Sequence, residues 1–354
     1  MSIKITGLGS YIPKRNVKNT DFENHEFLNQ DGSVFKHNNA IIVKKFKAIT
    51  GIEQRKYVQE GVTSTDIAFW SAEKAISDAG IEPETLDYII VAHNFGEVRD
   101  NCNQTDIIPS IASRVKNKLR IKNNNCVAYD LIFGCPGWVE AVIHARAFML
   151  AGMAKRCLVI GTETLSKVVD PHDRDSMIYA DGAGAAIIEK TPDDIPGGIF
   201  SCKTASFTFD ESAFIFNGKS YNPNTDNEAL YIKMYGRKIY EFALTQVPLA
   251  MKACLDESPF EIDQVSKILI HQANEKMDEA IVKRFYGLYD KEMPEGCMPM
   301  SITDLGNSSV ATVPTLYDLI VKNQLPPHRI EKGDVLILAS VGAGMNINAI
   351  VYQH

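Results

Sequence analysis

A cysteine at position 135 stands where a catalytic nucleophile could work. The apolar residues 128–133 lead into Gly-Cys-Pro-Gly at positions 134–137, and a strongly apolar helical pattern follows. Proline suits the first position of a helix because the N–H group that it lacks would be unpaired there. The pattern places Cys135 at a helix N-terminus, where the helix dipole is expected to lower the thiol pKa and free backbone N–H groups can bind an oxyanion. An inert buried cysteine is the structural alternative.

Two further side chains follow predicted elements at positions that suit a site. His271 ends the strand-like run 268–270, and strands of α/β sheets deliver side chains into sites at their carboxyl ends. Asn307 lies in a Gly-Asn turn that leads into a helical pattern, where its amide could donate hydrogen bonds. Each residue alone also has a structural interpretation, as a strand-end histidine or as part of a turn with a serine cap. Together with the thiol, they suit decarboxylative thioester chemistry.

The elements that must position these residues alternate between strand-like and helical patterns, which is typical of an α/β fold. The helical pattern at residues 139–151 is apolar on nearly every face, which predicts a central helix. Residues 19–47 are polar, with few periodic apolar positions, and we interpret them as an insertion near the surface. The other strand-like runs are residues 3–7, 86–92 and 156–162, and the other helical pattern is residues 65–79.

Two pairs of segments resemble each other across the chain. Residues 87–94 resemble residues 266–274, each a buried strand ending in His and Asn, and residues 156–162 resemble residues 334–340. We infer a duplication with an N-terminal half at 1–190 and a C-terminal half at 191–354, packed as one body. Residues 190–198, rich in Pro and Gly, would form the join. Chance similarity of buried strands is the alternative.

Glycine-rich segments follow or precede two of the strands. Residues 341–345 read Val-Gly-Ala-Gly-Met, and residues 181–185 read Asp-Gly-Ala-Gly-Ala. Neither is long enough for a GxGxxG fingerprint, and the Gly-Leu-Gly at residues 7–9 is followed by Pro13 instead of a helix. Nucleotide-binding interpretations therefore fail, and we expect the glycines to let the backbone approach the site.

Composition excludes several classes of protein. The 354 residues are 45% hydrophobic and 23% charged, as in folded globular chains, and 37 basic against 44 acidic residues give a net charge of −7. That sign argues against nucleic-acid binding. The seven cysteines show no CxxC spacing and the histidines no metal spacing, so we expect no metal and no disulfide framework. Lacking an apolar segment of about 18 residues, the chain is expected in the cytoplasm and away from membranes.

Taken jointly, the motifs resemble those of the β-ketoacyl-[acyl-carrier-protein] synthase III family. The resemblance covers nearly the whole chain and implies an α/β, thiolase-like fold. Two pseudo-duplicated halves would form a five-layered α-β-α-β-α body, and the protein would be a homodimer in fatty acid biosynthesis. It also implies the catalytic triad Cys135, His271 and Asn307. The matching segments are residues 51–55, 134–137, 170–174, 181–186, 271–274 and 306–314.

The resemblance implies a two-step reaction without a cofactor. Cys135 would accept an acyl group from a CoA-linked or phosphopantetheine-linked thioester, with the backbone N–H groups of Cys135 and Gly344 binding the oxyanion. A malonyl thioester on acyl carrier protein (ACP) would then lose carbon dioxide, and His271 Nε2 with the Asn307 amide would hold the enolate. Two neutral donors suit an enolate better than the Glu base of the related hydroxymethylglutaryl-CoA synthases.

The sequence departs from the fatty-acid enzymes in ways that concern the substrates. The Trp that commonly precedes the Gly-Ile motif is missing, and Lys44, Lys45 and Lys47 stand there instead. We expect an acyl carrier protein, or a CoA held differently, to meet these lysines, although a solvated charge run would look the same. By analogy, residues 103–110 reach into the partner's acyl pocket, with Ile108 near its gate.

Other functions stay open at this stage. The polar insertion suggests a specialised ketosynthase that condenses unusual acyl or β-ketoacyl thioesters in polyketide, pigment or signal biosynthesis. An acyltransferase that forms esters or amides would keep Cys135 and His271 but need no enolate, so Asn307 discriminates against it. A non-catalytic acyl-binding protein would have no reason to keep all three residues.

Overall fold

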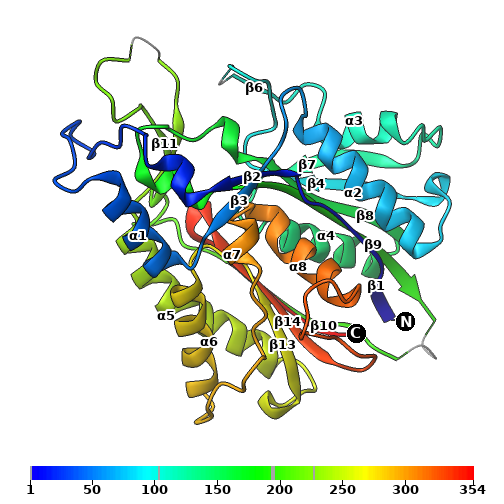
Figure 1. Ribbon diagram of the computed structural model, residues 1–354. Helices are drawn as coiled ribbons and strands as arrows, with labels where there is room; N and C mark the ends of the chain where they lie inside the picture. Colours follow the sequence, from blue (N-terminus) through cyan, green and yellow to red (C-terminus); the bar gives the residue numbers. More distant parts are fainter. Residues whose placement is uncertain (1, 103, 193–195, 226–227) are drawn as a thin grey trace.

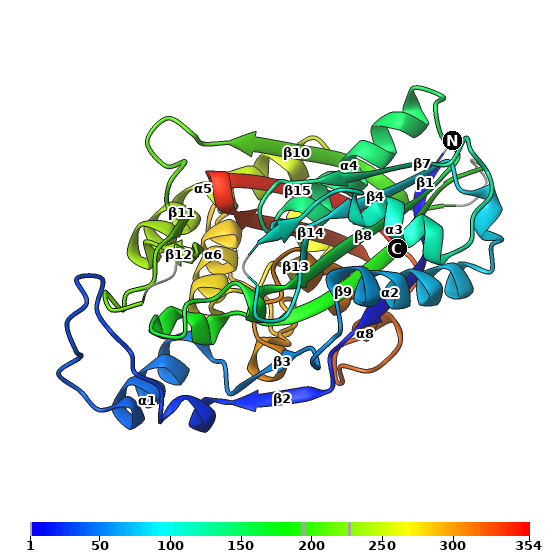
Figure 2. The same cartoon turned by 90° about the horizontal axis from the view of Figure 1, so that it is seen from above.

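The computed structural model describes residues 2–102, 104–192, 196–225 and 228–354. Two sheets and three helical layers alternate, with α2 and α3 outside the first sheet, α4 and α8 between the sheets, and α5 and α6 outside the second (Figures 1 and 2). The helices are α1 (Asn39–Thr50), α2 (Ser64–Ala79), α3 (Ile111–Lys118), α4 (Gly137–Leu150), α5 (Gly236–Asp256), α6 (Glu275–Gly287), α7 (Ile302–Leu305) and α8 (Thr312–Val321). This arrangement is the five-layered α/β body that the motifs implied.

The first sheet has the strand order β1-β9-β8-β4-β7. Strand β9 pairs antiparallel with β1 and β8, whereas β4 pairs parallel with β8 and β7. The strands are β1 (Ser2–Tyr11), β4 (Tyr88–Ala92), β7 (Val127–Leu131), β8 (Arg156–Thr164) and β9 (Asp181–Thr191).

The second sheet repeats this pairing, with the strand order β10-β15-β14-β13. Strand β15 pairs antiparallel with β10 and β14, and β13 pairs parallel with β14. The strands are β10 (Gly198–Ser206), β13 (Val265–Ile270), β14 (Val335–Gly342) and β15 (Asn346–Gln353). Strands β4 and β8 thus correspond to β13 and β14, the two pairs of segments that resemble each other in sequence. The division of the chain at residues 190 and 191 stays a prediction, and part of the expected join, residues 193–195, lies outside the described residues.

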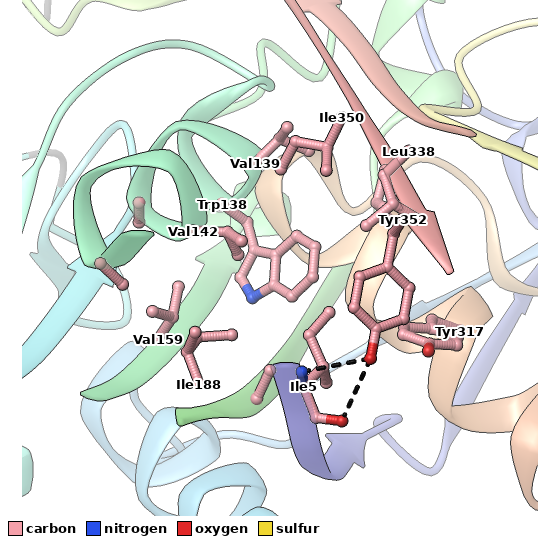
Figure 3. Close-up of a cluster of buried hydrophobic side chains, with 14 of the residues drawn as sticks. Ile5, Trp138, Val139, Val142, Val159, Ile188, Tyr317, Leu338, Ile350 and Tyr352 are labelled. Atoms are coloured by element: carbon pink, nitrogen blue, oxygen red, sulfur yellow. Dashed lines mark hydrogen bonds between the residues drawn. The ribbon is translucent and has the colours of Figure 1, made fainter. Parts of the chain in front are cut away.

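The core between the sheets forms around α4 and α8. Trp138, Val139 and Val142 of α4 are fully buried there, which confirms the central position predicted for this helix. Figure 3 shows Trp138 beside the side chain of Ile5 from the first sheet and that of Tyr352 from the second. The Tyr352 hydroxyl accepts a hydrogen bond from the Ile5 N–H (3.2 Å) and donates one to its carbonyl (3.4 Å), which joins the two sheets directly.

Smaller elements surround the layers. Two-stranded sheets are formed by β2 (Arg15–Lys18) with β3 (Gln54–Tyr57), by β5 (Glu97–Val98) with β6 (Thr105–Asp106), and by β11 (Ile215–Gly218) with β12 (Tyr231–Met234). Short 3₁₀ helices are η1 (Asn19–Phe22), η2 (Pro83–Thr85), η3 (Leu165–Lys167), η4 (Arg174–Ile178), η5 (Ile262–Gln264), η6 (Ser309–Ala311) and η7 (Ala343–Met345). The described residues include no helix that could cross a membrane.

The segment 19–47 is more ordered than its sequence indicated. Its last third belongs to α1, which packs at the edge of the molecule in Figure 2. Ile42, Val43 and Phe46 share one face of this helix and pack on Phe22 and Phe27 in a separate small core. Few apolar positions were expected here, and the three at i, i+1 and i+4 suffice for a short amphipathic helix.

Candidate active site

A cavity of about 400 Å³ opens where β7, β13 and β14 end, and its walls are mostly apolar. Cys135, His271, Asn307 and Gly344 all line it, although they come from widely separated parts of the sequence. The structure therefore brings together the four residues expected to do chemistry. Further walls come from the β11–β12 hairpin, through Ile215, Phe216, Asn217, Ile232 and Met234.

Cys135 lies two residues before α4, because Pro136 is the N-cap residue and not, as the sequence suggested, the first residue of the helix. Two glycines let the backbone come close to it. Gly134 has φ +69°, and a Cβ at this position would lie 2.6 Å from the backbone N and O atoms of Ala343. A Cβ on Gly342 would lie 2.4 Å from the Cys135 nitrogen. Larger residues at either position would push the 342–344 turn away from the sulfur, as expected for these glycines.

The expectation that the helix terminus lowers the thiol pKa was wrong. Burial raises the pKa of Cys135 to about 11, and the nearby Glu163 carboxylate acts in the same direction. The hydrogen bond that the Ser309 hydroxyl donates to the sulfur, at 3.2 Å, and the Cys135 backbone act against this increase. The loss of hydration around the sulfur is the largest of these effects, and with a pKa of about 11 Cys135 is a neutral thiol near pH 7.

His271 follows β13, and its N–H donates to the Ala339 carbonyl of β14 at 2.9 Å. The next residues anchor it. The buried Gln272 side chain bonds the Pro299 carbonyl (2.9 Å) and the Ser301 N–H (2.9 Å), and Asn274 caps α6. Burial lowers the pKa of His271 to about 4, so its imidazole is neutral near pH 7.

Asn307 is fixed through both its backbone and its side chain. Its N–H donates to the Ile178 carbonyl (3.0 Å), and its carbonyl accepts from the Ala180 N–H (2.8 Å). The side-chain oxygen Oδ1 accepts a hydrogen bond from the Ser309 N–H at 2.8 Å. This contact sets the orientation of the amide, and it leaves the two hydrogens on Nδ2 as donors for a molecule in the cavity.

Sequence reasoning missed three residues that contact the site. Ser309 and Asn94 line the cavity, and the buried Glu163 bonds Asn94 behind it. Ser309 was visible in the Asn307 motif but taken as a possible cap. Asn94 lies two residues past the end of β4, where a strand can deliver a side chain into a site. Glu163 is a carboxylate inside a buried strand, which is an uncommon location that could have drawn attention. His93, beside Asn94, is structural, because its ring bonds Asp130 (2.9 Å) and the Gly96 N–H (2.9 Å).

The expected substrate contacts lie elsewhere. Lys44, Lys45 and Lys47 are exposed on α1, where Lys44 and Lys47 line a separate surface hollow and Lys47 pairs with Glu53. Ile108 is 84% exposed beside the β5–β6 hairpin. Asn103, the first residue of the stretch expected at the partner's pocket, lies outside the described residues. The roles of all four side chains stay predictions.

Comparison with known proteins gives consistent matches. Residues 129–206 match the family model of 3-oxoacyl-[acyl-carrier-protein (ACP)] synthase III, and residues 255–354 match that of its C-terminal part. β-Ketoacyl-[acyl-carrier-protein] synthase III 1 of Vibrio vulnificus is 31% identical over 345 residues, 97% of each chain. The crystal structure of 3-oxoacyl-[acyl-carrier-protein] synthase III from Aquifex aeolicus superposes with a TM-score of 0.81 and 25% identity over 99% of this chain and all of that one. The priming β-ketosynthase of the R1128 polyketide pathway shares the fold, with a TM-score of 0.78 and 22% identity over 99% of this chain and 96% of its own.

Fold and cavity together define a thiolase-like condensing enzyme, an acyltransferase by class. The Vibrio relative matches 97% of this chain at 31% identity, which is enough to assign the family within this class. The chain belongs to the 3-oxoacyl-[acyl-carrier-protein] synthase III family, as its motifs implied.

Proposed function

We propose that this protein joins an acyl group to a malonyl unit by two steps at Cys135. In the first step, the sulfur attacks the carbonyl carbon of an acyl thioester and the departing thiol takes up the proton that Cys135 gives away. The oxyanion of the tetrahedral intermediate would accept hydrogen bonds from the backbone N–H groups of Cys135 and Gly344. The product is an acyl-enzyme, and this exchange uses no cofactor beyond the CoA or phosphopantetheine that carries the acyl group.

In the second step, a malonyl thioester, carried on ACP, loses carbon dioxide and becomes an enolate. The neutral imidazole of His271 and the Nδ2 hydrogens of Asn307 would hydrogen-bond the enolate oxygen. The enolate carbon attacks the acyl group, the new carbon–carbon bond forms, and the Cys135 thiolate leaves and is reprotonated. We infer that this takes place in the cytoplasm, where malonyl-ACP would supply the two-carbon unit.

The observation that carries this proposal is the meeting of Cys135, His271 and Asn307 in one apolar cavity. Acyl transfer to the sulfur needs only Cys135 and His271. The Asn307 amide, held in place by the Ser309 N–H, is a donor that suits an enolate. Release of labelled carbon dioxide from carboxyl-labelled malonyl-ACP, in proportion to β-ketoacyl product, tests it. Ester or amide formation without carbon dioxide would favour the acyltransferase alternative.

Carrier recognition at α1 gives a first prediction. An acidic carrier surface would meet the exposed Lys44, so Lys44→Glu should slow Cys135 acylation by acyl-ACP about threefold to tenfold, mainly through slower association. Acylation by the matched acyl-CoA should be unchanged. Lys332→Glu is the control, since Lys332 is exposed just before β14, at the end of that strand away from the cavity. A strong preference of the unmodified protein for acyl-CoA would contradict carrier recognition at α1.

The homodimer that we propose for this protein gives a second prediction. Ile107 and Ile108 are neighbouring exposed apolar residues, 51% and 84% exposed, which suits a contact with a second copy. If Ile108 reaches the partner's acyl pocket, Ile108→Trp should shift the preferred donor to shorter chains in acylation assays with acyl-CoAs of increasing length. Ile49→Trp, an exposed apolar position on α1, is the control. Unchanged chain selectivity in Ile108→Trp would contradict the assignment.

A further inference from the structure

A chain of hydrogen bonds connects a buried carboxylate to the sulfur of Cys135. Glu163, in β8, is 2% exposed, and Asn94 lies just beyond the end of β4. Asn94 Nδ2 lies 2.6 Å from Glu163 Oε1 and 3.1 Å from Ser309 Oγ. Ser309 Oγ in turn lies 3.2 Å from Cys135 Sγ. Four residues from four separate parts of the chain therefore form one continuous path.

The direction of every hydrogen bond in this path is determined. The Asn94 backbone N–H also donates to Glu163 Oε1, at 2.8 Å, so the carboxylate is an acceptor fixed by two donors. The two hydrogens on Asn94 Nδ2 go to Glu163 and to Ser309 Oγ. Because the Ser309 oxygen accepts from Asn94, its single hydrogen is free to point at the sulfur. The path therefore presents a hydroxyl donor, and not an acceptor, to Cys135.

We propose that Ser309 is a catalytic residue, which stabilises the Cys135 thiolate by the hydrogen bond that its hydroxyl donates to the sulfur, and that Asn94 and Glu163 are positioning residues, which orient this hydroxyl. This inference rests on the proposed function, because it explains how the nucleophile of the first step is activated. A hydrogen bond donated to a charged form favours that form. It also serves the second step, in which the thiolate is the leaving group.

The conformation of Ser309 supports this role. Its φ of +53° lies in the left-handed region, which costs a non-glycine residue free energy and persists where the surroundings fix it. Here the Asn307 side chain fixes it, by accepting the Ser309 N–H. The same turn thus aims the Asn307 amide at the cavity and the Ser309 hydroxyl at the sulfur.

The other titratable groups around the sulfur do not stabilise the thiolate. His271 is neutral because burial lowers its pKa to about 4, and burial raises the pKa of Tyr179 well above its usual value, which keeps that phenol neutral. Glu163 opposes the thiolate by its charge, even though it orients Asn94. Burial raises the pKa of Glu163 to about 7, an increase that His93 opposes and Asp181 reinforces.

The test is the pH dependence of Cys135 alkylation by iodoacetamide, followed at the Cys135 peptide by mass spectrometry in a Cys102→Ser background, since Cys102 is exposed. Ser309→Ala should alkylate at least about tenfold more slowly at pH 8, with its profile shifted to higher pH. Ser309→Gly should do the same, and glycine accepts a positive φ, so this variant also covers a folding failure of the first. Asn94→Ala should shift the profile in the same direction by less.

Two controls separate the hydrogen bond from other effects. Ser308→Ala makes the same change one residue earlier, where the hydroxyl faces Thr312 at 3.4 Å, and should leave the profile unchanged. Glu163→Gln keeps an oxygen acceptor for Asn94 but removes the charge, so its profile should move to lower pH. The proposal is overturned if Ser309→Ala and Ser309→Gly keep the unmodified profile. Alkylation needs no acyl substrate, so it reports on this path even if Cys135 carries no acyl group and the proposed function fails.

Discussion

Cys135→Ala protein is expected to form no acyl-enzyme and to lose condensation by about 10³-fold or more, because the atom that holds the acyl group between the two steps is missing. Decarboxylation of malonyl-ACP should survive in this variant. The donors assigned to that step, His271 and Asn307, lie on other elements and do not depend on the sulfur. Intact-protein mass spectrometry measures the first effect and labelled carbon dioxide the second.

Cys102→Ser is the matched control for this change. Cys102 is the exposed thiol that could be acylated without any role in catalysis, and its loss should alter neither activity. Condensation at an undiminished rate in Cys135→Ala would remove Cys135 from the mechanism. Loss of acylation and of decarboxylation together, in a variant with unchanged circular dichroism, would show that the two steps do not divide as proposed.

In contrast to Cys135→Ala, Asn307→Asp is expected to lose decarboxylation and to keep acylation of Cys135. The aspartate keeps an oxygen that can accept the Ser309 N–H, so the turn should hold, but it lacks the Nδ2 hydrogens and adds a negative charge beside the enolate. Loss of one oxyanion donor costs about 10²–10³-fold. We therefore expect carbon dioxide release and condensation to fall by at least that factor while Cys135 is still acylated.

Asn307→Ala separates the donor from the turn. It removes both the Nδ2 hydrogens and the acceptor for Ser309, so it should lose decarboxylation as Asn307→Asp does and, in addition, slow Cys135 acylation. Single-turnover acylation and labelled carbon dioxide release, measured on the same preparations, give both quantities. Decarboxylation near the original rate in Asn307→Asp would contradict the role of the amide.

The sequence could predict the positions of the reactive residues because each has a strong local signal. Cys135 and His271 follow apolar strand-like runs. Pro136 and Gly137 indicate the start of a helix, and Asn307 lies in a Gly-Asn turn before another helical pattern. The apolar pattern of α4 also predicted its central layer, since a helix buried on all sides has no polar face.

Features that depend on tertiary contacts could not be predicted. The pKa of Cys135 depends on how completely neighbouring atoms exclude water from the sulfur, and no local pattern reports that. The path from Glu163 through Asn94 to Ser309 joins residues up to 215 positions apart. Likewise, Ile215, Phe216 and Ile232 of the β11–β12 hairpin belong to neither of the two main sheets, and only the fold places them on the cavity wall.

Peptide mapping of the unmodified protein tests the central claim most directly. After incubation with an acyl-CoA or acyl-ACP, the added mass should lie on the peptide that contains Cys135. Addition of malonyl-ACP should then remove it, with one carbon dioxide and one β-ketoacyl product for each acyl group lost. An acyl group found on Cys102 or another residue, or one that stays on Cys135 after malonyl-ACP is added, would contradict the account.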